Sequence, residues 1–384
     1  MKRKKLNELK FLRNIVIGIV SLLIVAIIIN IAPGYKRDKY TNVINLIINE
    51  ENRTEDLKHD IYVNENGTIY ISEEDVKNLF DATIYHDEKY NQIITTSDTK
   101  VANIVIDEKK MVVNNSEVSM LDAIIKINDN IYLPISDMSI VYNINISYIE
   151  NTNRVIIDEL DKGMIKAKVS EESDIKFKPR SLSKKVGIVK QGETVTCFYT
   201  TSKGWRQIRT ENGTIGYVKA NKLTSEYILR QDMLEREQAI KISKDTYANN
   251  KFEVADNTGV KTIVLKNMFN INNGNIEVNA DGQNTDEKYK LWVSISNKSL
   301  EKQTNTLLED YKSRTKLIDA IVSKSIENSI NGISIDFSGI DDKNMIRFII
   351  ELTPKLREIG ITTSLVLNNN IEQDIIEIVD YIIE

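Results

Sequence analysis

Cysteine and histidine are almost absent from this chain of 384 residues, which has one cysteine and two histidines. A single cysteine, Cys197, excludes an intrachain disulfide and any paired-cysteine metal or redox motif. Two histidines, His59 and His86, leave too few ligands for a zinc site, because such sites draw mainly on cysteine and histidine. The sequence therefore predicts no metal site and no cofactor.

Proline is also scarce, and acidic residues slightly outnumber basic ones. Four prolines argue against long proline-rich linkers. The formal net charge is −5, whereas proteins that read nucleic acids are usually basic, so no nucleic-acid partner is expected. The chain has 41% hydrophobic and 28% charged residues, which is a globular composition, and its length predicts two or three domains.

An apolar run near the N-terminus carries no charge over residues 15–32. As a helix it would rise about 27 Å, close to the ~30 Å hydrocarbon thickness of a bilayer. A cleaved signal fits less well, because the run exceeds the usual ~7–15 apolar residues and no A-x-A site follows. Basic residues are more numerous before the run than after it. We therefore expect a cytoplasmic segment at 1–14, a single-pass transmembrane helix at 15–32, and the bulk of the chain outside the cytoplasm at the cell membrane.

Two later segments repeat with a constant offset of 62 residues, which relates Tyr70 to Tyr132 and Asn91 to Asn153. Each copy predicts a short strand, a short helix and a β-hairpin, with hairpin turns at 88–91 and 150–153. On this pattern, residues 41–160 resemble the copper amine oxidase N-terminal-like domain of bacterial surface proteins. The resemblance implies an α+β spacer or wall-contact module and promises no copper site.

Short strands separated by turn residues follow at 163–225. Gly204-Trp205 and Gly216-Tyr217-Val218 flank Asn212-Gly213, a strong hairpin-turn signal. This pattern resembles a bacterial SH3-like domain, which implies a small all-β barrel that binds peptidoglycan stem or cross-bridge peptides. Under this resemblance, Trp205 and Tyr217 are candidates for a ligand-facing aromatic surface. Core packing of a small barrel would explain the two side chains equally well.

Apolar runs alternate with helical patterns through residues 226–384. The expected helices are 306–331 and 343–359, and the expected strands are 239–242, 262–265, 291–294, 332–337, 363–367 and 380–383. Strand–helix alternation predicts a parallel sheet with right-handed crossovers.

The segment 331–338, NGISIDFS, resembles strand four of glycoside hydrolase family 18, whose pattern is D-x-x-D-x-D-x-E, and in particular the spore-cortex and cell-wall lytic branch. The resemblance implies a TIM-type (β/α) barrel, incomplete here because six strands are found instead of eight. Asp336 matches the aspartate that orients the substrate N-acetyl group. Ser338 stands where the family has the glutamate that protonates the glycosidic oxygen. A serine hydroxyl is too weak an acid for that role.

The predicted fold class is therefore multidomain, with a transmembrane helix, a duplicated α+β domain, a small all-β SH3-like barrel and an incomplete α/β barrel. The leading hypothesis is a membrane-anchored, extracytoplasmic protein that binds peptidoglycan or another N-acetylglucosamine-containing glycan, with a chitinase-like barrel that no longer hydrolyses. One alternative is an active family-18-type glycosidase acting on wall or spore-cortex glycans through an unrecognised acid. Another is a non-catalytic envelope or sporulation scaffold with protein partners.

Overall fold

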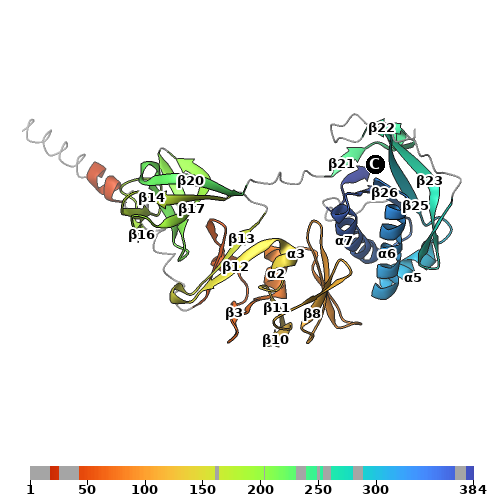
Figure 1. Cartoon of the computed structure of the whole chain (residues 1–384), viewed down its shortest axis with the longest axis horizontal. Helices are drawn as coiled ribbons and strands as arrows, with labels where there is room; N and C mark the ends of the chain where they lie inside the picture. Colours follow the sequence, from red (N-terminus) through yellow and green to blue (C-terminus); the bar gives the residue numbers. More distant parts are fainter. Residues whose placement is uncertain are drawn as a thin grey trace, which may run out of the picture. The chain divides into compact units, whose positions relative to one another are not determined.

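The computed structural model describes residues 18–25, 43–160, 164–202, 204–230, 239–248, 251–253, 261–279, 289–367 and 378–384 (Figure 1). Two compact units divide the chain, each drawn from two separate stretches of sequence. Unit 1 comprises Met1–Asp75 and Asn143–Met233, and unit 2 comprises Val76–Tyr142 and Leu234–Glu384. The described residues form five β-sheets, so the protein is multidomain and rich in β-structure. The region predicted as one domain at 41–160 contributes to both units.

The structure does not support the predicted transmembrane helix at 15–32. Of this segment, residues 18–25 are described and are helical, while the remainder lies outside the described residues. None of the helices in the described ranges is long and apolar enough to cross a membrane. What the structure supports of the predicted fold class is a multidomain protein with many β-sheets.

The predicted internal duplication is confirmed element by element. The first copy comprises β4 (Ile69–Ser72), α2 (Glu73–Leu79), β5 (Tyr85–Asp87) and β6 (Gln92–Thr96). The second comprises β11 (Asn130–Pro134), α3 (Ser139–Tyr142), β12 (Ile144–Ile149) and β13 (Arg154–Glu159). Asn91 and Asn153 both adopt positive φ at the predicted hairpin turns, with values of 47° and 51°. Asparagine tolerates this left-handed conformation better than most residues, which explains its recurrence there.

The offset of 62 residues also relates two aspartates, Asp75, which is buried, and Asp137, which is half-buried. The Asp75 carboxylate accepts backbone hydrogen bonds from Lys58 (2.7 Å) and His59 (3.1 Å). The Asp137 carboxylate, 62 residues later, accepts a backbone bond from Leu121 (3.0 Å) and a longer one from Asp122 (3.4 Å). In each copy, the acidic residue of the predicted helix therefore fixes a preceding loop.

Unit 1 combines the second hairpin with an all-β region. In one sheet, β13 pairs in parallel with β1 (Asn45–Ile48), which pairs with β2 (Glu51–Asn52). In another sheet, β3 (Tyr62–Val63) pairs with β4. Single 3₁₀ turns are η3 (Thr54–Asp56), η4 (Glu150–Thr152) and η5 (Ala220–Lys222). The all-β region forms a seven-stranded sheet in the order β16-β15-β19-β18-β17-β14-β20. Its strands are β14 (Met164–Val169), β15 (Ser173–Lys176), β16 (Lys185–Val189), β17 (Thr194–Ser202), β18 (Trp205–Thr210), β19 (Ile215–Lys219) and β20 (Leu223–Arg230).

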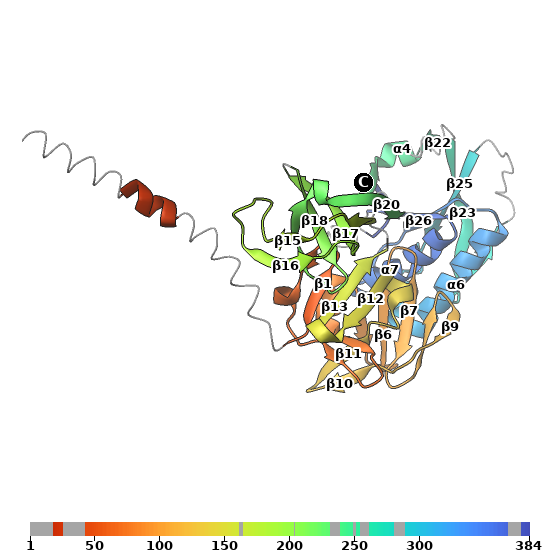
Figure 2. The same cartoon turned by 60° about the vertical axis from the view of Figure 1, so that its left-hand side comes forward.

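Unit 2 combines the first hairpin with the α/β region. The hairpin continues as an antiparallel meander through β7 (Val101–Val105), β8 (Lys110–Val113) and β9 (Ser116–Ser119). Strand β10 (Ile125–Ile127) pairs with β11. Helix α7 (Asp342–Glu358) contacts both β6 and β7, so the meander and the α/β region pack together within this unit (Figure 2).

All six strands predicted for the C-terminal region lie in one sheet, in the order β21-β28-β27-β26-β25-β23-β22. The pairs from β21 through β23 are parallel, as predicted, and β22 is antiparallel. Within the described residues the sheet has two edges, β21 and β22, and is therefore open. The strands are β21 (Ile240–Ile242), β22 (Lys251–Glu253), β23 (Lys261–Asn272), β24 (Asn275–Val278), β25 (Tyr289–Ser296), β26 (Gly332–Asp336), β27 (Thr362–Val366) and β28 (Tyr381–Ile383).

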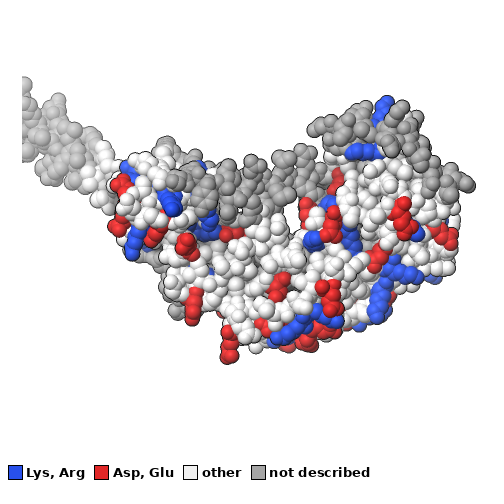
Figure 3. All heavy atoms as spheres, in the orientation of Figure 1, with Lys and Arg blue, Asp and Glu red and all other residues white. Residues whose placement is uncertain are grey.

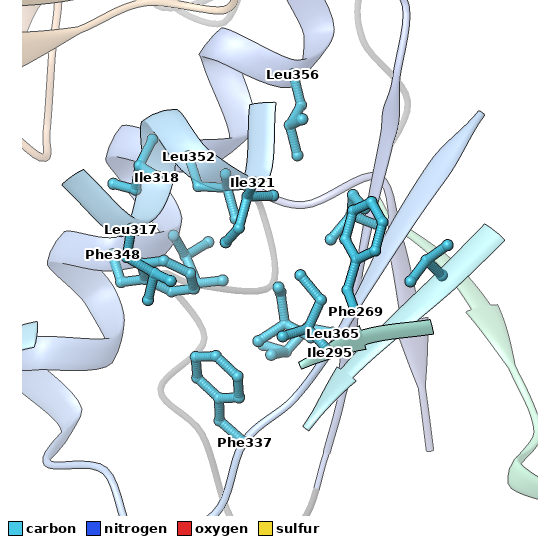
Figure 4. Close-up of a cluster of buried hydrophobic side chains, with 14 of the residues drawn as sticks. Phe269, Ile295, Leu317, Ile318, Ile321, Phe337, Phe348, Leu352, Leu356 and Leu365 are labelled. Atoms are coloured by element: carbon cyan, nitrogen blue, oxygen red, sulfur yellow. The ribbon is translucent and has the colours of Figure 1, made fainter. Parts of the chain in front are cut away.

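Helices cover one face of this sheet. They are α5 (Glu301–Glu309), α6 (Tyr311–Glu327) and α7, and the short α4 (Lys244–Ala248) follows β21. The single helix predicted at 306–331 is two helices, because Asp310 interrupts it and caps α6 by accepting from the Ser313 amide. The core lies between the sheet and α6 and α7, and its side chains are drawn in Figure 4. There Ile295 and Leu365 from the strands face Leu317 and Leu352 from the helices.

Candidate binding site

Trp205 lies on a face of the all-β sheet that points away from the sheet's apolar core. Strands β18 and β19 pair Trp205 with Lys219 and Gln207 with Tyr217. Directly paired residues share a face and successive residues alternate. Ile208 and Val218 therefore point to the other face, where they join the buried apolar cluster. Trp205 lies outside this cluster but is only 9% exposed, so core packing and a ligand-facing role both stay open for it.

A hollow of about 400 Å³ opens beside Trp205, whose own exposure is 9%. Charged side chains of both signs line it, together with two serines. The lining residues are Glu172, Ser173, Asp174, Lys176, Ser181, Trp205, Lys219 and Lys222. Protein sites for small ligands are typically about 300–1,000 Å³, so the hollow is large enough for a short peptide or a sugar.

Ion pairs set the charges around this hollow. The Asp174 carboxylate lies 2.6 Å from the Lys185 ammonium and 3.1 Å from that of Lys176. These hydrogen bonds, the one from Lys185 first, hold the pKa of Asp174 below its ordinary value. Lys222 pairs with Glu171. Acidic and basic side chains are interspersed over the face shown in Figure 3, as they are among the residues that line the hollow.

One wall of the hollow comes from the loop at 177–184. The loop is closed by a bond from the Phe177 amide to the Lys184 carbonyl (2.9 Å) and by one from the Lys178 amide to the Ser183 hydroxyl (2.8 Å). Ser181, near its tip, lines the hollow, and Leu182 beside it is 94% exposed. These bonds pre-form the wall, which lowers the entropy cost of binding a ligand against it.

Tyr217, the second predicted binding residue, lies next to the hollow and not among its lining residues. Its side chain is half-buried and its hydroxyl donates to the Gln207 side-chain oxygen at 3.3 Å. It shares a sheet face with Trp205 and Lys219. The structure thus brings one of the two predicted aromatics to the hollow and places the other beside it.

The predicted catalytic remnants occupy the carboxyl end of β26. Asp336 ends the strand and is half-buried, while Ser338 follows it and is exposed. The Asn297 side chain holds the Ser338 backbone on both sides, accepting from its amide (2.9 Å) and donating to its carbonyl (2.8 Å). Asn297 is fully buried, so this loop is anchored firmly.

A row of buried serines crosses the sheet next to Asp336. Ser294, Ser334 and Ser364 are neighbours on three adjacent parallel strands. The Tyr247 hydroxyl from α4 donates toward the Ser334 hydroxyl at 2.9 Å. Burial raises the pKa of the Tyr247 phenol, which therefore stays protonated at neutral pH. The same face also carries a small apolar cluster that includes Trp292 and Val366, whereas the opposite face carries the larger apolar core.

Sequence reasoning missed the lysines and acids around the hollow and the role of Asn297. The lysines could have been found in part, because Lys219 follows Tyr217 by two residues and so shares its face. Asn297 lies 41 residues before Ser338, and no local pattern links the two.

Comparison with curated proteins gives no match. Among solved structures, the chain is similar to a protein described as a sporulation-specific glycosylase, ydhD from Bacillus subtilis, with 17% identity and a TM-score of 0.27, over 32% of this chain and 48% of that one. It is also similar to chitinase ChiW from Paenibacillus sp. str. FPU-7, with 12% identity and a TM-score of 0.26, over 59% and 25% of the two chains. A third similarity is to NlpC1 from Trichomonas vaginalis, with 13% identity and a TM-score of 0.16, over 37% and 40%.

Each of these matches spans less than half of the other chain, and TM-scores of this size establish no shared fold. The match to a family model is more specific. Residues 48–157 match the model described as the copper amine oxidase N-terminal domain, which confirms the resemblance predicted for 41–160. That match covers less than half of the chain, so it is a likeness of the duplicated region and does not assign the whole protein to a family.

Proposed function

We propose that this protein binds the bacterial cell wall, with the hollow beside Trp205 receiving a short peptide of peptidoglycan. The observation that carries the proposal is the hollow itself, whose lining includes one aromatic ring together with lysines and carboxylates. The resemblance of residues 163–225 to bacterial SH3-like domains supports the same ligand class.

The chemistry of the lining suits a ligand that carries both charges. A free peptide end or side chain presents a carboxylate, which lysines bind, and an amine, which carboxylates bind. Lys219 and Lys222 supply the first kind of partner, and Glu172 supplies the second. The Trp205 ring offers apolar area for an aliphatic side chain. A neutral glycan would use the ring but not the charges.

The α/β region, in this proposal, derives from a glycosidase and does not hydrolyse. Ser338 stands where the resemblance requires the proton donor, and its hydroxyl cannot act as a carboxylic acid. Loss of general acid catalysis typically removes about 10²–10⁴ in rate. The sheet end around Asp336 would then contribute at most to glycan binding.

A wall ligand places the working protein outside the cytoplasm, where peptidoglycan is found. Protease treatment of intact protoplasts tests this part of the proposal. Digestion of the bulk of the chain supports it, and complete protection contradicts it.

The direct test is co-sedimentation of the full chain with purified peptidoglycan. Wild-type protein should pellet with the wall, and Trp205→Ala should lose most of that binding. Tyr62→Ala is the matched control, because Tyr62 is an exposed aromatic residue of the same unit, far along the chain from the hollow. A soluble stem peptide should compete and a chitooligosaccharide should not. The reverse pattern of competition would replace the peptide with a glycan.

A further inference from the structure

The two hairpins of the duplicated region each cover a face of a different domain. In unit 1 the second hairpin packs on the all-β sheet, and in unit 2 the first hairpin packs on helices α6 and α7. The contacts within each unit show which face of the hairpin is used.

In the first hairpin, Tyr85, Ile94 and Asn103 are directly paired neighbours on β5, β6 and β7 and therefore share one face. The Tyr85 hydroxyl donates to Glu351 of α7 at 2.5 Å. The Asn103 amide donates to the Tyr311 hydroxyl of α6 at 2.6 Å. Ile94, between them, is fully buried. This face is therefore the one that meets the helices (Figure 2).

A buried arginine lies at the centre of this contact. Arg314 of α6 and Glu351 of α7 form an ion pair at 2.9 Å, with exposures of 0% and 2%. Arg314 also donates to the Tyr85 hydroxyl at 2.8 Å and to the Leu308 carbonyl at 2.6 Å. Tyr85 thus completes the hydrogen bonding of a charge pair that water does not reach.

Polar contacts surround the arginine. Lys355 donates to both Asn115 (2.8 Å) and Asp319 (2.9 Å). Asp310 accepts from Lys89 (2.5 Å) and from Tyr90 (2.8 Å). The antiparallel meander therefore contacts the ends of helices α6 and α7 as well as the buried arginine between them.

In the second hairpin, Arg154, Ile156 and Asp158 are alternate residues of β13 and share one face. Asp158 pairs with the buried Arg209 of β18 at 2.7 Å. Arg154 donates to the Asn212 carbonyl at 2.8 Å. Ile156 packs with Ile47 and Ile215.

The Gly213 turn is fitted closely to this face. A Cβ atom at Gly213 would approach the side chains of Arg154, Ile47 and Ile156 within 2.9–3.2 Å. Its φ of +77° also favours glycine, so two independent constraints select that residue. The Asn212-Gly213 turn therefore also allows the all-β region to pack closely against the second hairpin.

The strand face used is equivalent in the two copies, although most of the contacting residues differ. Ile94 and Ile156 differ by 62 positions, which is the offset of the duplication, and both lie at the middle of the buried face. We propose that this hairpin face is a docking surface built into the repeat, and that each copy is fitted to one domain of the chain that presents a buried arginine to it. The partner is thus a folded face of this same protein, and the duplicated region is an attachment module.

A buried arginine suits such a surface. A buried arginine that loses a partner in a closed interface is destabilising. Without the second hairpin Arg209 would lose the Asp158 carboxylate, whereas without the first hairpin Arg314 would keep Glu351 and lose only the Tyr85 hydroxyl. The two copies therefore differ, since the first supplies a tyrosine to an existing Arg–Glu pair and the second supplies the carboxylate itself. Each domain should therefore be specific for its own copy.

Hydrogen exchange of the full chain tests this with two matched substitutions. Arg314→Gln should speed exchange about tenfold or more in β5, β6, β7 and α7, with β1 and β13 unchanged. Arg209→Gln should do the converse, affecting β1, β13 and β18 and sparing the first hairpin. If Arg314→Gln does not fold, Tyr85→Phe removes only the hydroxyl and should give the same pattern at smaller size.

Three results would overturn the proposal. The first is a change confined to α6 and α7 on Arg314→Gln or Tyr85→Phe, with the first hairpin unaltered. The second is an equal response of both hairpins to either substitution. The third is unchanged exchange in every hairpin strand.

Discussion

The Trp205 hollow and the carboxyl end of β26 both gather polar side chains at a sheet, but the partners of those side chains differ. Around the hollow, lysines and carboxylates form surface ion pairs such as Asp174 with Lys185. Near β26, the Ser334 hydroxyl accepts a hydrogen bond from the Tyr247 hydroxyl, and the Asn297 side chain accepts one from the Ser338 amide.

The hollow has exposed ion pairs that a charged ligand can replace, whereas the end of β26 has buried hydrogen bonds that the fold itself uses. Exposed ion pairs are worth only about 0–1 kcal/mol, so a charged ligand can replace one partner at little cost. Buried hydrogen bonds such as those of Ser334 are costly to leave unmade. A fold can therefore persist after its chemistry is lost, while binding is provided by another domain.

The largest expected effects come from two glycines, one in each region. A Cβ atom at Gly216 would lie 2.5 Å from Ile175, and one at Gly332 would lie 2.4 Å from Trp292. Overpacking of this kind costs typically about 1–3 kcal/mol. Gly216→Ala should therefore destabilise the all-β region and abolish wall binding. Gly332→Ala should destabilise the α/β sheet and leave wall binding intact, as measured by thermal denaturation and co-sedimentation.

If Gly332→Ala abolished wall binding while the all-β region stayed folded, the ligand site would belong to the α/β sheet. Circular dichroism cannot distinguish the two regions, so hydrogen exchange of β18 and β26 provides the control. Each substitution should affect only its own strand.

A smaller effect is expected from the lysines of the hollow. Lys219→Ala and Lys222→Ala should each weaken wall binding by about two- to tenfold, because each removes one cation from a partly exposed site. The loss should shrink as salt is raised, since exposed charges are screened. Lys190→Ala is the matched control, because Lys190 is an exposed lysine of the same region that does not line the hollow.

The end of β26 should give almost no effect on binding. Asp336→Asn and Ser338→Ala should leave wall binding within about twofold of wild type. Neither wild-type protein nor Ser338→Glu should release sugar from N-acetylglucosamine-containing glycans. Turnover that survives Ser338→Ala but disappears in Asp336→Asn would show that the acid lies elsewhere in the α/β region.

The smallest expected effect concerns pH. Hydrogen bonds from Lys185 and Lys176 lower the folded-state pKa of Asp174, so these bonds stabilise the fold at pH values above the ordinary aspartate range. That contribution is lost as pH falls below about 4 toward the lowered pKa. Asp174→Asn should therefore loosen the loop at 177–184 slightly at neutral pH. Amide exchange should show the wild-type and variant loops converging in acid.

Much of the strand content could be predicted because it depends on local sequence patterns. The six strands of the C-terminal sheet and the hairpin turns at Asn91 and Asn153 follow from apolar periodicity and turn chemistry. The division of 306–331 into two helices was missed, although Asp310 accepting from the Ser313 amide is a local N-cap; only the contact of Asp310 with Lys89 depends on the fold.

The candidate site was predictable only in part. The aromatic character of Trp205 is evident in the sequence, but the side of the sheet on which it lies depends on pairing with β19. The division of the repeat between two units was also missed, because it depends on single residues such as Arg314 and Arg209 reaching strands more than fifty positions away. Long-range charge pairs leave no periodic pattern in a sequence.

The most direct test of wall binding uses the tryptophans themselves. The chain has two, and Trp292 is buried in the α/β sheet with 1% exposure. Fluorescence of a Trp292→Phe variant therefore reports on Trp205 alone. Titration with a soluble peptidoglycan stem peptide should give a saturable change in that emission, and a variant with Trp205→Phe and Trp292 intact should give none. An unchanged Trp205 emission in protein that still pellets with the wall would contradict the account.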